Sequence, residues 1–180
     1  MYIWIGIDVE KQLLDVKEKA IDVDKALAFK NSCFTLPMHI SLKMSFPIRI
    51  SEKEEIIKTI IDYYATIKPF EIELNKIEKY EHIVWIRMKE NEYLNKISFD
   101  LNDILLKKYK IGLHEYDLDY QFHTTLFMDD DSDKVNRAFA EIQSVVLPKT
   151  ISANKFAIGT SESGDLGTFS IYRSMAVTLK

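Results

Sequence analysis

Two short stretches of the sequence, His39-Ile40-Ser41-Leu42 and His123-Thr124-Thr125-Leu126, share one pattern. Each lies in a run of apolar and β-branched residues that predicts a strand. Alternate side chains of a strand project to the same face, so the histidine and the hydroxyl residue two positions later point the same way. The residues between them then face the opposite, packed side. Each stretch therefore presents one imidazole and one hydroxyl together.

The predicted elements around these stretches come in a repeated order: a helix, a strand, a second helix and two strands. In the first half they cover 10–30, 38–46, 51–68, 70–80 and 82–88, and in the second half 91–110, 121–128, 134–147, 150–160 and 168–179. A short strand over 2–7 precedes them. The two motifs occupy equivalent places, since 123 − 39 and 125 − 41 are both 84. We interpret this as an internal duplication with repeats near 8–90 and 91–180, which predicts a single domain of two pseudo-symmetric lobes.

Local signals mark the ends of several helices. Ser51 followed by Glu54 has the spacing of a capping box, so a helix should begin there. Gly112 follows the helix over 91–110 as a stop signal. The acidic tract over 129–133 predicts a turn into the next helix, whose N-terminal dipole suits carboxylates.

Composition limits the classes of partner. The 180 residues carry a net charge of −4, with an isoelectric point near 5.6, so the chain lacks the basic surface typical of proteins that bind long duplex nucleic acid. A small nucleotide or an RNA terminus remains a suitable substrate. The single cysteine, Cys33, cannot form an internal disulfide and fits either a reducing compartment or a small buried apolar residue. With no signal peptide or membrane span expected, we predict a cytoplasmic monomer with no membrane partner.

The two motifs suit phosphodiester cleavage if the lobes place them across a central groove. One imidazole can accept a proton from water or a ribose hydroxyl, while the other donates a proton to the leaving oxygen. Hydroxyl groups can donate hydrogen bonds to the non-bridging phosphate oxygens. We therefore expect His39 and His123 to be catalytic and Ser41 and Thr125 to bind phosphate. No cluster of residues has metal-ligand spacing, so neither a metal nor another cofactor is expected.

Four further residues are candidates for substrate contacts, and three of them have a structural alternative. By alternation, Lys43 shares the face of His39 and could neutralise phosphate, or it could be a lysine at the solvent end of a strand. Tyr120 and Phe122 could stack on a base or belong to the core. Arg173, in the last predicted strand, could bind phosphate through its forked guanidinium.

The sequences HISL and HTTL resemble the paired H-x-[ST]-hydrophobic signature of the two-histidine (2H) phosphoesterase superfamily, which includes the LigT-like enzymes historically called 2′-5′ RNA ligases. The resemblance spans the whole chain, and Thr124 departs from it as a polar residue at a normally apolar position. It implies an α+β fold of two antiparallel-sheet lobes, with outer helices around a central cleft. It also implies metal-independent activity on 2′,3′-cyclic phosphates or 2′-5′ linkages.

Two other function classes compete with an enzyme. A nucleotide- or RNA-end-binding module could keep the fold without turnover, although such a protein has no need of two proton-transfer groups. A structural interaction protein with two incidental motifs would keep His39 and His123 buried or far apart.

Overall fold

The computed structural model describes residues 1–30, 33–118 and 120–177, whose strands form two four-stranded antiparallel sheets. The first sheet has the order β2-β1-β7-β8, with strands β2 (His39–Pro47), β1 (Tyr2–Asp8), β7 (Lys155–Ser161) and β8 (Ser170–Ala176). The second sheet has the order β5-β4-β3-β6, with strands β5 (His123–Met128), β4 (Ile83–Met88), β3 (Phe70–Tyr80) and β6 (Thr150–Ala153). The expected hairpin of β3 and β4 is confirmed.

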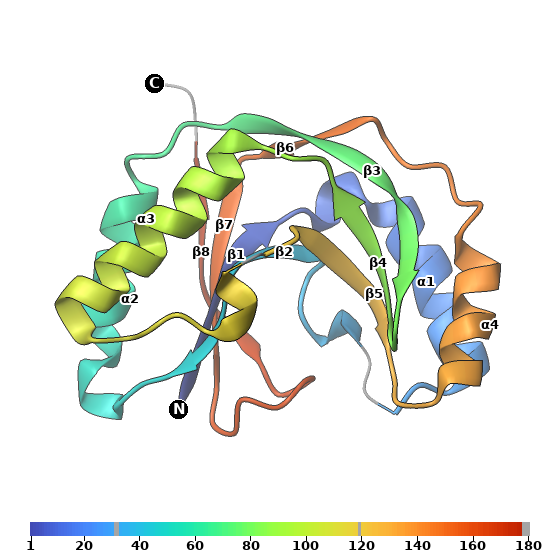
Figure 1. The fold of residues 1–180 in the computed structure, drawn as a ribbon, viewed down its shortest axis with the longest axis horizontal. Coiled ribbons are helices and arrows are strands. Elements are labelled where there is room, and N and C mark those ends of the chain that lie inside the picture. The colour runs from blue at the N-terminus through green and yellow to red at the C-terminus, as the bar shows by residue number, and fades with distance from the viewer. Residues whose placement is uncertain (31–32, 119, 178–180) are drawn as a thin grey trace.

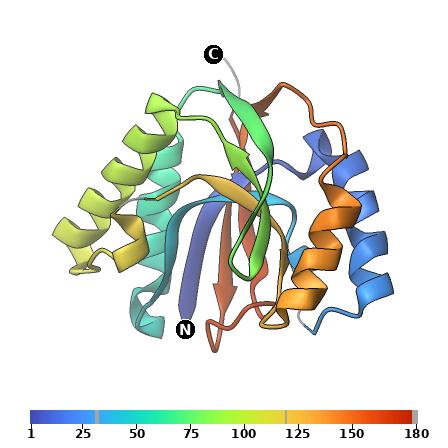
Figure 2. The ribbon, with the colours of Figure 1, turned by 45° about the vertical axis from the view of Figure 1, so that its right-hand side comes forward.

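The α-helices lie in two pairs at opposite ends of the molecule, with the sheets between them (Figures 1 and 2). One pair is α1 (Leu14–Leu27) with α4 (Ser132–Ile142), and α4 also packs on β3, β4 and β5. The other pair is α2 (Lys53–Tyr64) with α3 (Glu92–Tyr109), and α3 also packs on β2. Four short 3-10 turns, η1 to η4, cover Glu10–Gln12, Cys33–Thr35, Ile50–Glu52 and Glu115–Asp117. This is the expected α+β arrangement of two lobes with outer helices.

One apolar core joins the two lobes. On α4 the buried residues Val135, Ala138 and Ile142 recur at helical spacing and form one face. Buried residues of both sheets belong to the same cluster as this face, including Ile5 and Ile86. The lobes therefore share a continuous interface rather than being joined only by a linker.

Each sheet takes strands from both halves of the chain. The expected single strand over 150–160 is in fact two strands, because β6 pairs with β3 in the second sheet and β7 pairs with β1 in the first. The exposed Asn154 lies between them, where the chain passes from one sheet to the other. The repeats near 8–90 and 91–180 remain a prediction about the sequence, and their boundary does not coincide with the division into sheets.

Two of the expected helix signals are wrong. Ser51 lies inside η3, and α2 begins after Glu52 with no side-chain cap, so the capping box does not form. The helix α3 ends at Tyr109, and its C-cap residue Lys110, rather than Gly112, adopts the left-handed conformation (φ 60°). The acidic tract does form the expected turn, where the carboxylate of Asp131 accepts hydrogen bonds from the backbone amides of residues 133 and 134 at the start of α4.

A β-bulge in β2 moves Lys43 away from the face of the motif. Gly6 pairs with Ser41, but the preceding residue Ile5 pairs with Lys43, so β2 holds the extra residue Leu42. Lys43 thereby lies opposite a core residue and is buried. The expectation that Lys43 projects beside His39 and contacts phosphate is wrong, because the bulge breaks the alternation.

The buried ammonium of Lys43 instead joins three elements. It donates to the Asn102 side chain of α3 (2.7 Å), to the Gly112 carbonyl (3.1 Å) and to Asp117 Oδ2 of η4 (2.7 Å). The side chains of Lys43 and Asp117 are each only 1% exposed. Asp117 also accepts from the backbone amide of Met44. This ion pair therefore fixes the loop that leads into β5.

We expect Lys43→Met to lower the free energy of unfolding by about 3–5 kcal/mol, because it leaves the Asp117 carboxylate buried without its counter-ion. Urea unfolding followed by circular dichroism measures the loss. The matched control is Lys58→Met, which breaks the exposed Lys58–Asp62 pair and should cost at most about 1 kcal/mol. Equal losses in the two variants would contradict the structural role of the buried pair.

Candidate active site

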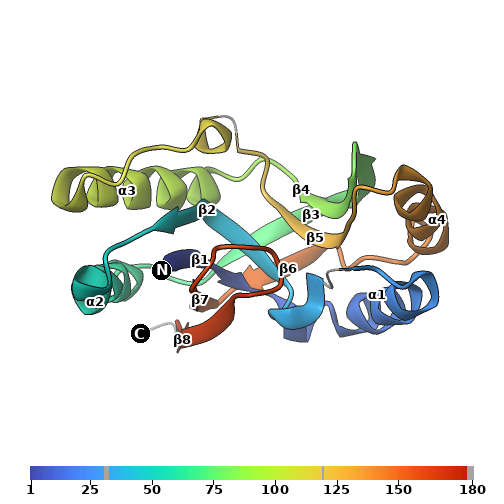
Figure 3. The same cartoon turned by 90° about the horizontal axis from the view of Figure 1, so that it is seen from below.

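The two motifs meet at the junction of the two sheets. His39 begins β2 and His123 begins β5, and these strands are the edges of the first and second sheets. The two edge strands contact each other in the middle of the molecule (Figure 3). The fold thus brings together side chains that lie 84 positions apart in the sequence.

Both imidazole rings are held by the same kind of hydrogen bond. His39 Nδ1 lies 2.7 Å from the carbonyl oxygen of Pro37, and His123 Nδ1 lies 2.6 Å from that of Gln121. A carbonyl oxygen can only accept, so Nδ1 of each ring carries the proton and donates it. In the neutral ring, Nε2 is then the basic nitrogen. Both histidines are therefore oriented in the tautomer that a general base requires.

A tryptophan from the neighbouring strand packs against each histidine. The ring centroids of Trp4 (β1) and His39 are 4.4 Å apart, and those of Trp85 (β4) and His123 are 4.3 Å apart. They are the two tryptophans of the sequence. A Cβ atom at Gly6 would overlap the indole of Trp4, so glycine is required for this close packing. The matched neighbours give the two histidines similar, partly dehydrated surroundings.

Dehydration lowers the pKa of both histidines. Burial lowers the pKa of His39 from 6.5 to about 4, the hydrogen bond to the Pro37 carbonyl opposes this shift, and the nearby His123 lowers the pKa further. Burial also lowers the pKa of His123, against the effect of the hydrogen bond to the Gln121 carbonyl. Both shifts favour the neutral form of the rings in the free protein. A bound phosphate anion would raise the pKa of whichever ring it contacts.

The two hydroxyl residues lie on the same faces as their histidines. Ser41 and Thr125 are half-buried between buried neighbours. Ser41 Oγ accepts a hydrogen bond of 2.9 Å from the indole nitrogen of Trp4. Thr124, the departure from the family pattern, is buried at 1% exposure and packs as a core residue. Ser41 and Thr125 thus project on the same sides of their strands as His39 and His123.

Of the aromatic candidates, Tyr120 reaches the site and Phe122 does not. The Tyr120 ring lies 5.7 Å from that of His123, and burial raises the pKa of Tyr120 to about 12, against the effect of a hydrogen bond with Ser41. Tyr120 therefore connects the two motifs. Phe122 is buried in the core, so the expectation that it stacks on a base is wrong.

Arg173 does not point into the groove either. It lies on β8, at the far edge of the first sheet from β2, and pairs with Ile158, a core residue. The side chain of Trp4 lies on the opposite face of the first sheet, together with that of Ala157. The expectation of a phosphate contact from Arg173 is therefore wrong.

The residues that flank the motifs on neighbouring strands were not predicted from the sequence. Arg87 pairs directly with His123 across β4 and β5, and Asp8 pairs with His39 across β1 and β2. Asp8 forms an ion pair of 2.6 Å with Lys155. The alternation of β4 could have placed Trp85 and Arg87 on one face, because the core-facing residues of this strand alternate with them. What the sequence lacked was the order of the strands.

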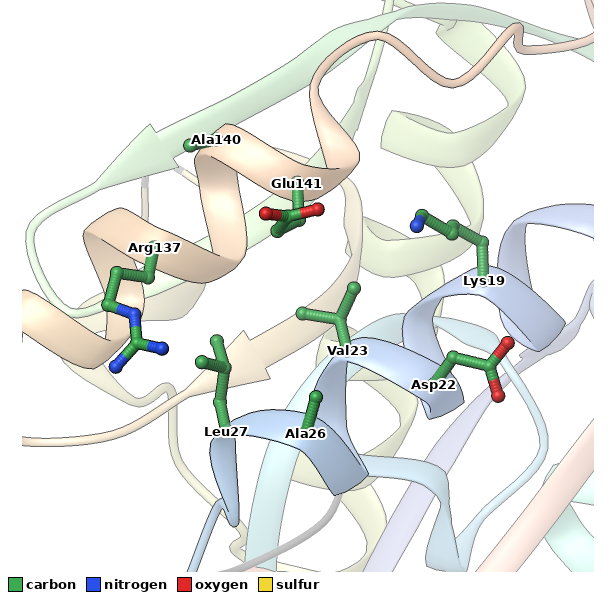
Figure 4. A pocket seen from close by; sticks show the side chains of 8 residues that line it. All are labelled: Lys19, Asp22, Val23, Ala26, Leu27, Arg137, Ala140 and Glu141. Carbon is green, nitrogen blue, oxygen red and sulfur yellow. The ribbon is translucent and has the colours of Figure 1, made fainter.

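A cavity of about 400 Å³ opens beside His39 and is lined by residues that include Asp8, Pro37 and Lys155. A second cavity of about 460 Å³ lies between α1 and α4, and its lining includes the charged side chains of Lys19, Asp22, Arg137 and Glu141 (Figure 4). The lining of this second cavity contains none of the four motif residues. The lining of the first cavity also lacks these four residues, but it includes Pro37, whose carbonyl binds His39, and Asp8, the cross-strand partner of His39.

Neither a metal cluster nor a membrane-spanning helix occurs among the described residues, 1–30, 33–118 and 120–177. This part of the chain contains no group of three or more His, Cys, Asp or Glu side chains that could hold a metal ion. It also contains no helix with the length and apolarity needed to span a bilayer.

Comparison with known proteins agrees with this geometry. The family model of the 2′-5′ RNA ligase superfamily matches residues 19–165. Similar solved structures include TT0787 of Thermus thermophilus, with 14% identity over 98% of each chain and a TM-score of 0.63. Escherichia coli LigT complexed with 3′-AMP has 14% identity over 98% of each chain and a TM-score of 0.59. No protein with a curated description matches the chain. At this identity the structural likeness establishes the fold alone.

We expect the stability of the wild-type protein to fall more steeply between pH 6.5 and pH 4 than that of His39→Gln. In this range the unfolded chain protonates His39 while the folded state keeps the ring neutral, so acid favours unfolding. Urea unfolding at a series of pH values, monitored by tryptophan fluorescence, measures the two slopes. Parallel pH dependences would show that folding does not hold His39 neutral.

Proposed function

Because the chain belongs to the 2′-5′ RNA ligase superfamily, we propose that it is a metal-independent phosphoesterase with two catalytic histidines. The substrates that we propose are 2′,3′-cyclic phosphates or 2′-5′ phosphodiester bonds, in RNA ends or small nucleotides. The observation that carries the proposal is the matched pair of imidazoles, each with Nδ1 bound to a backbone carbonyl at the junction of the two sheets. The solved LigT complexes with 3′-AMP, ATP and NADP⁺ support a nucleotide ligand.

In the proposed reaction, one histidine acts as base and the other as acid. For a cyclic phosphate, Nε2 of the first ring takes a proton from water as the new P–O bond forms. The second ring, protonated in the complex with the anionic substrate, donates its proton to the ribose oxygen as the P–O bond to that oxygen breaks. The two rings have then exchanged protonation states, and proton exchange with solvent restores them.

The hydroxyl residues would hold the charge of the phosphate during this step. The indole of Trp4 occupies one lone pair of Ser41 Oγ, and when the hydroxyl of Tyr120 donates to the other, the proton of Ser41 is available to a phosphate oxygen. The hydroxyl of Thr125 takes the corresponding place in the second motif. Such donors act where negative charge develops in the transition state. We also propose that the protein is cytoplasmic and monomeric.

The test is hydrolysis of a panel of 2′,3′-cyclic nucleotides and 2′-5′-linked dinucleotides in the presence of EDTA. We expect turnover by the wild type and a loss of roughly 10²- to 10⁴-fold in kcat for His39→Ala and for His123→Ala. The position of the phosphate in the product identifies the bond that is cleaved.

The matched control is His82→Ala, in the turn between β3 and β4, where the imidazole is exposed and lies outside the site. This variant should keep wild-type activity. Binding of nucleotides without turnover by the wild type would favour the silent binding module. Full activity in either motif variant would refute the two-histidine mechanism.

A further inference from the structure

A row of aromatic rings extends from His123 along the open face of the second sheet, the face that carries His123, Trp85 and Tyr80. The rings of Trp85 and His123 are 4.3 Å apart between centroids. On the other side, the rings of Trp85 and Tyr80 are 5.5 Å apart and nearly parallel, with an interplanar angle of 4°. A single ring, that of Trp85, therefore lies between Tyr80 and His123.

The far end of this row is open to solvent. Trp85 is only 8% exposed, whereas Tyr80 is 57% exposed. A nearly parallel stack covers one face of a ring and leaves the opposite face uncovered. Nucleobases stack on such exposed aromatic faces with little dependence on base identity. The Tyr80 ring, supported from behind by Trp85, has the properties of a stacking surface for a base.

A cationic group lies beside the same row. Arg87 is the cross-strand partner of His123, shares the face of Trp85 by alternation, and has a side chain that is 41% exposed. Glu78 is 3.9 Å from its guanidinium, beyond hydrogen-bond distance, and also lies 3.3 Å from the ammonium of Lys76. The two cations share this one carboxylate, so the cluster keeps a net positive charge near His123. A second phosphate could bind there.

We propose that Tyr80 and Arg87 form a second nucleotide subsite, which binds the nucleotide next to the reacting phosphate in a single RNA strand. The base stacks on the exposed face of Tyr80, and the guanidinium of Arg87 contacts the phosphate that links the two nucleotides. This inference rests on the proposed function. It deepens that function by making the preferred substrate a strand of at least two nucleotides with a 2′,3′-cyclic phosphate end. A lone cyclic nucleotide leaves the subsite empty.

The test compares kcat/KM for a short RNA that ends in a 2′,3′-cyclic phosphate with kcat/KM for 2′,3′-cyclic AMP. We expect the wild type to prefer the RNA. The ratio of the two values should fall roughly 5- to 150-fold in Tyr80→Ala, the range that loss of one base–aromatic stack implies. Tyr80→Phe keeps the ring and should restore the ratio, and Arg87→Gln should reduce it.

The matched control is Tyr93→Ala. Tyr93 is also an exposed tyrosine stacked on another ring, that of Phe70, but it lies at the start of α3. The ratio should stay at the wild-type value in this variant. A wild type that prefers the cyclic mononucleotide, or a Tyr80→Ala ratio equal to that of Tyr93→Ala, would overturn the proposal.

A binding measurement separates this inference from the proposed function. Fluorescence anisotropy of a labelled tetranucleotide with a 3′-phosphate reports the subsite without any turnover. Weaker binding by Tyr80→Ala than by Tyr93→Ala would support the subsite even if no substrate is hydrolysed. Hydrolysis of cyclic nucleotides with equal binding by the two variants would leave the proposed function standing and reject the subsite.

Discussion

The contact between the edge strands β2 and β5 is the constraint on which the rest of the structure depends. Each strand begins with a histidine, so the contact of the two edges places both imidazoles at one junction. A backbone carbonyl two residues earlier then fixes each ring through Nδ1. The orientation of both rings is thus a property of the backbone, which the core of the two lobes holds in place. A reaction that needs two correctly oriented imidazoles depends on this rigidity.

The two halves of the site match in outline and differ in detail. The indole nitrogen of Trp4 donates to Ser41, whereas the buried indole nitrogen of Trp85 has no hydrogen-bond partner among the residues that the structure describes. The buried ion pair of Lys43 and Asp117 supports the loop before His123. These differences give His39 and His123 distinct surroundings within a shared geometry. Unequal surroundings of this kind can make one histidine the acid and the other the base.

The periodicity of the sequence predicted much of the fold and the faces of both motifs. It failed where a side chain depends on a neighbouring strand. The bulge that buries Lys43 exists only in the pairing of β2 with β1, and the chain passes from one sheet to the other at Asn154. Likewise, only the strand order shows that Trp4 lies beside His39 and that Trp85 lies beside His123. A single strand carries no information about its partners.

A titration with inorganic phosphate, followed by NMR, tests directly whether both motifs act on one phosphate. Long-range ¹H–¹⁵N spectra resolve Nδ1 and Nε2 of each imidazole. We expect the Nε2 signals of His39 and His123 to shift together and saturate with one dissociation constant, while each Nδ1 stays protonated. A shift in one ring only, or two separate dissociation constants, would show that the histidines do not form a single site.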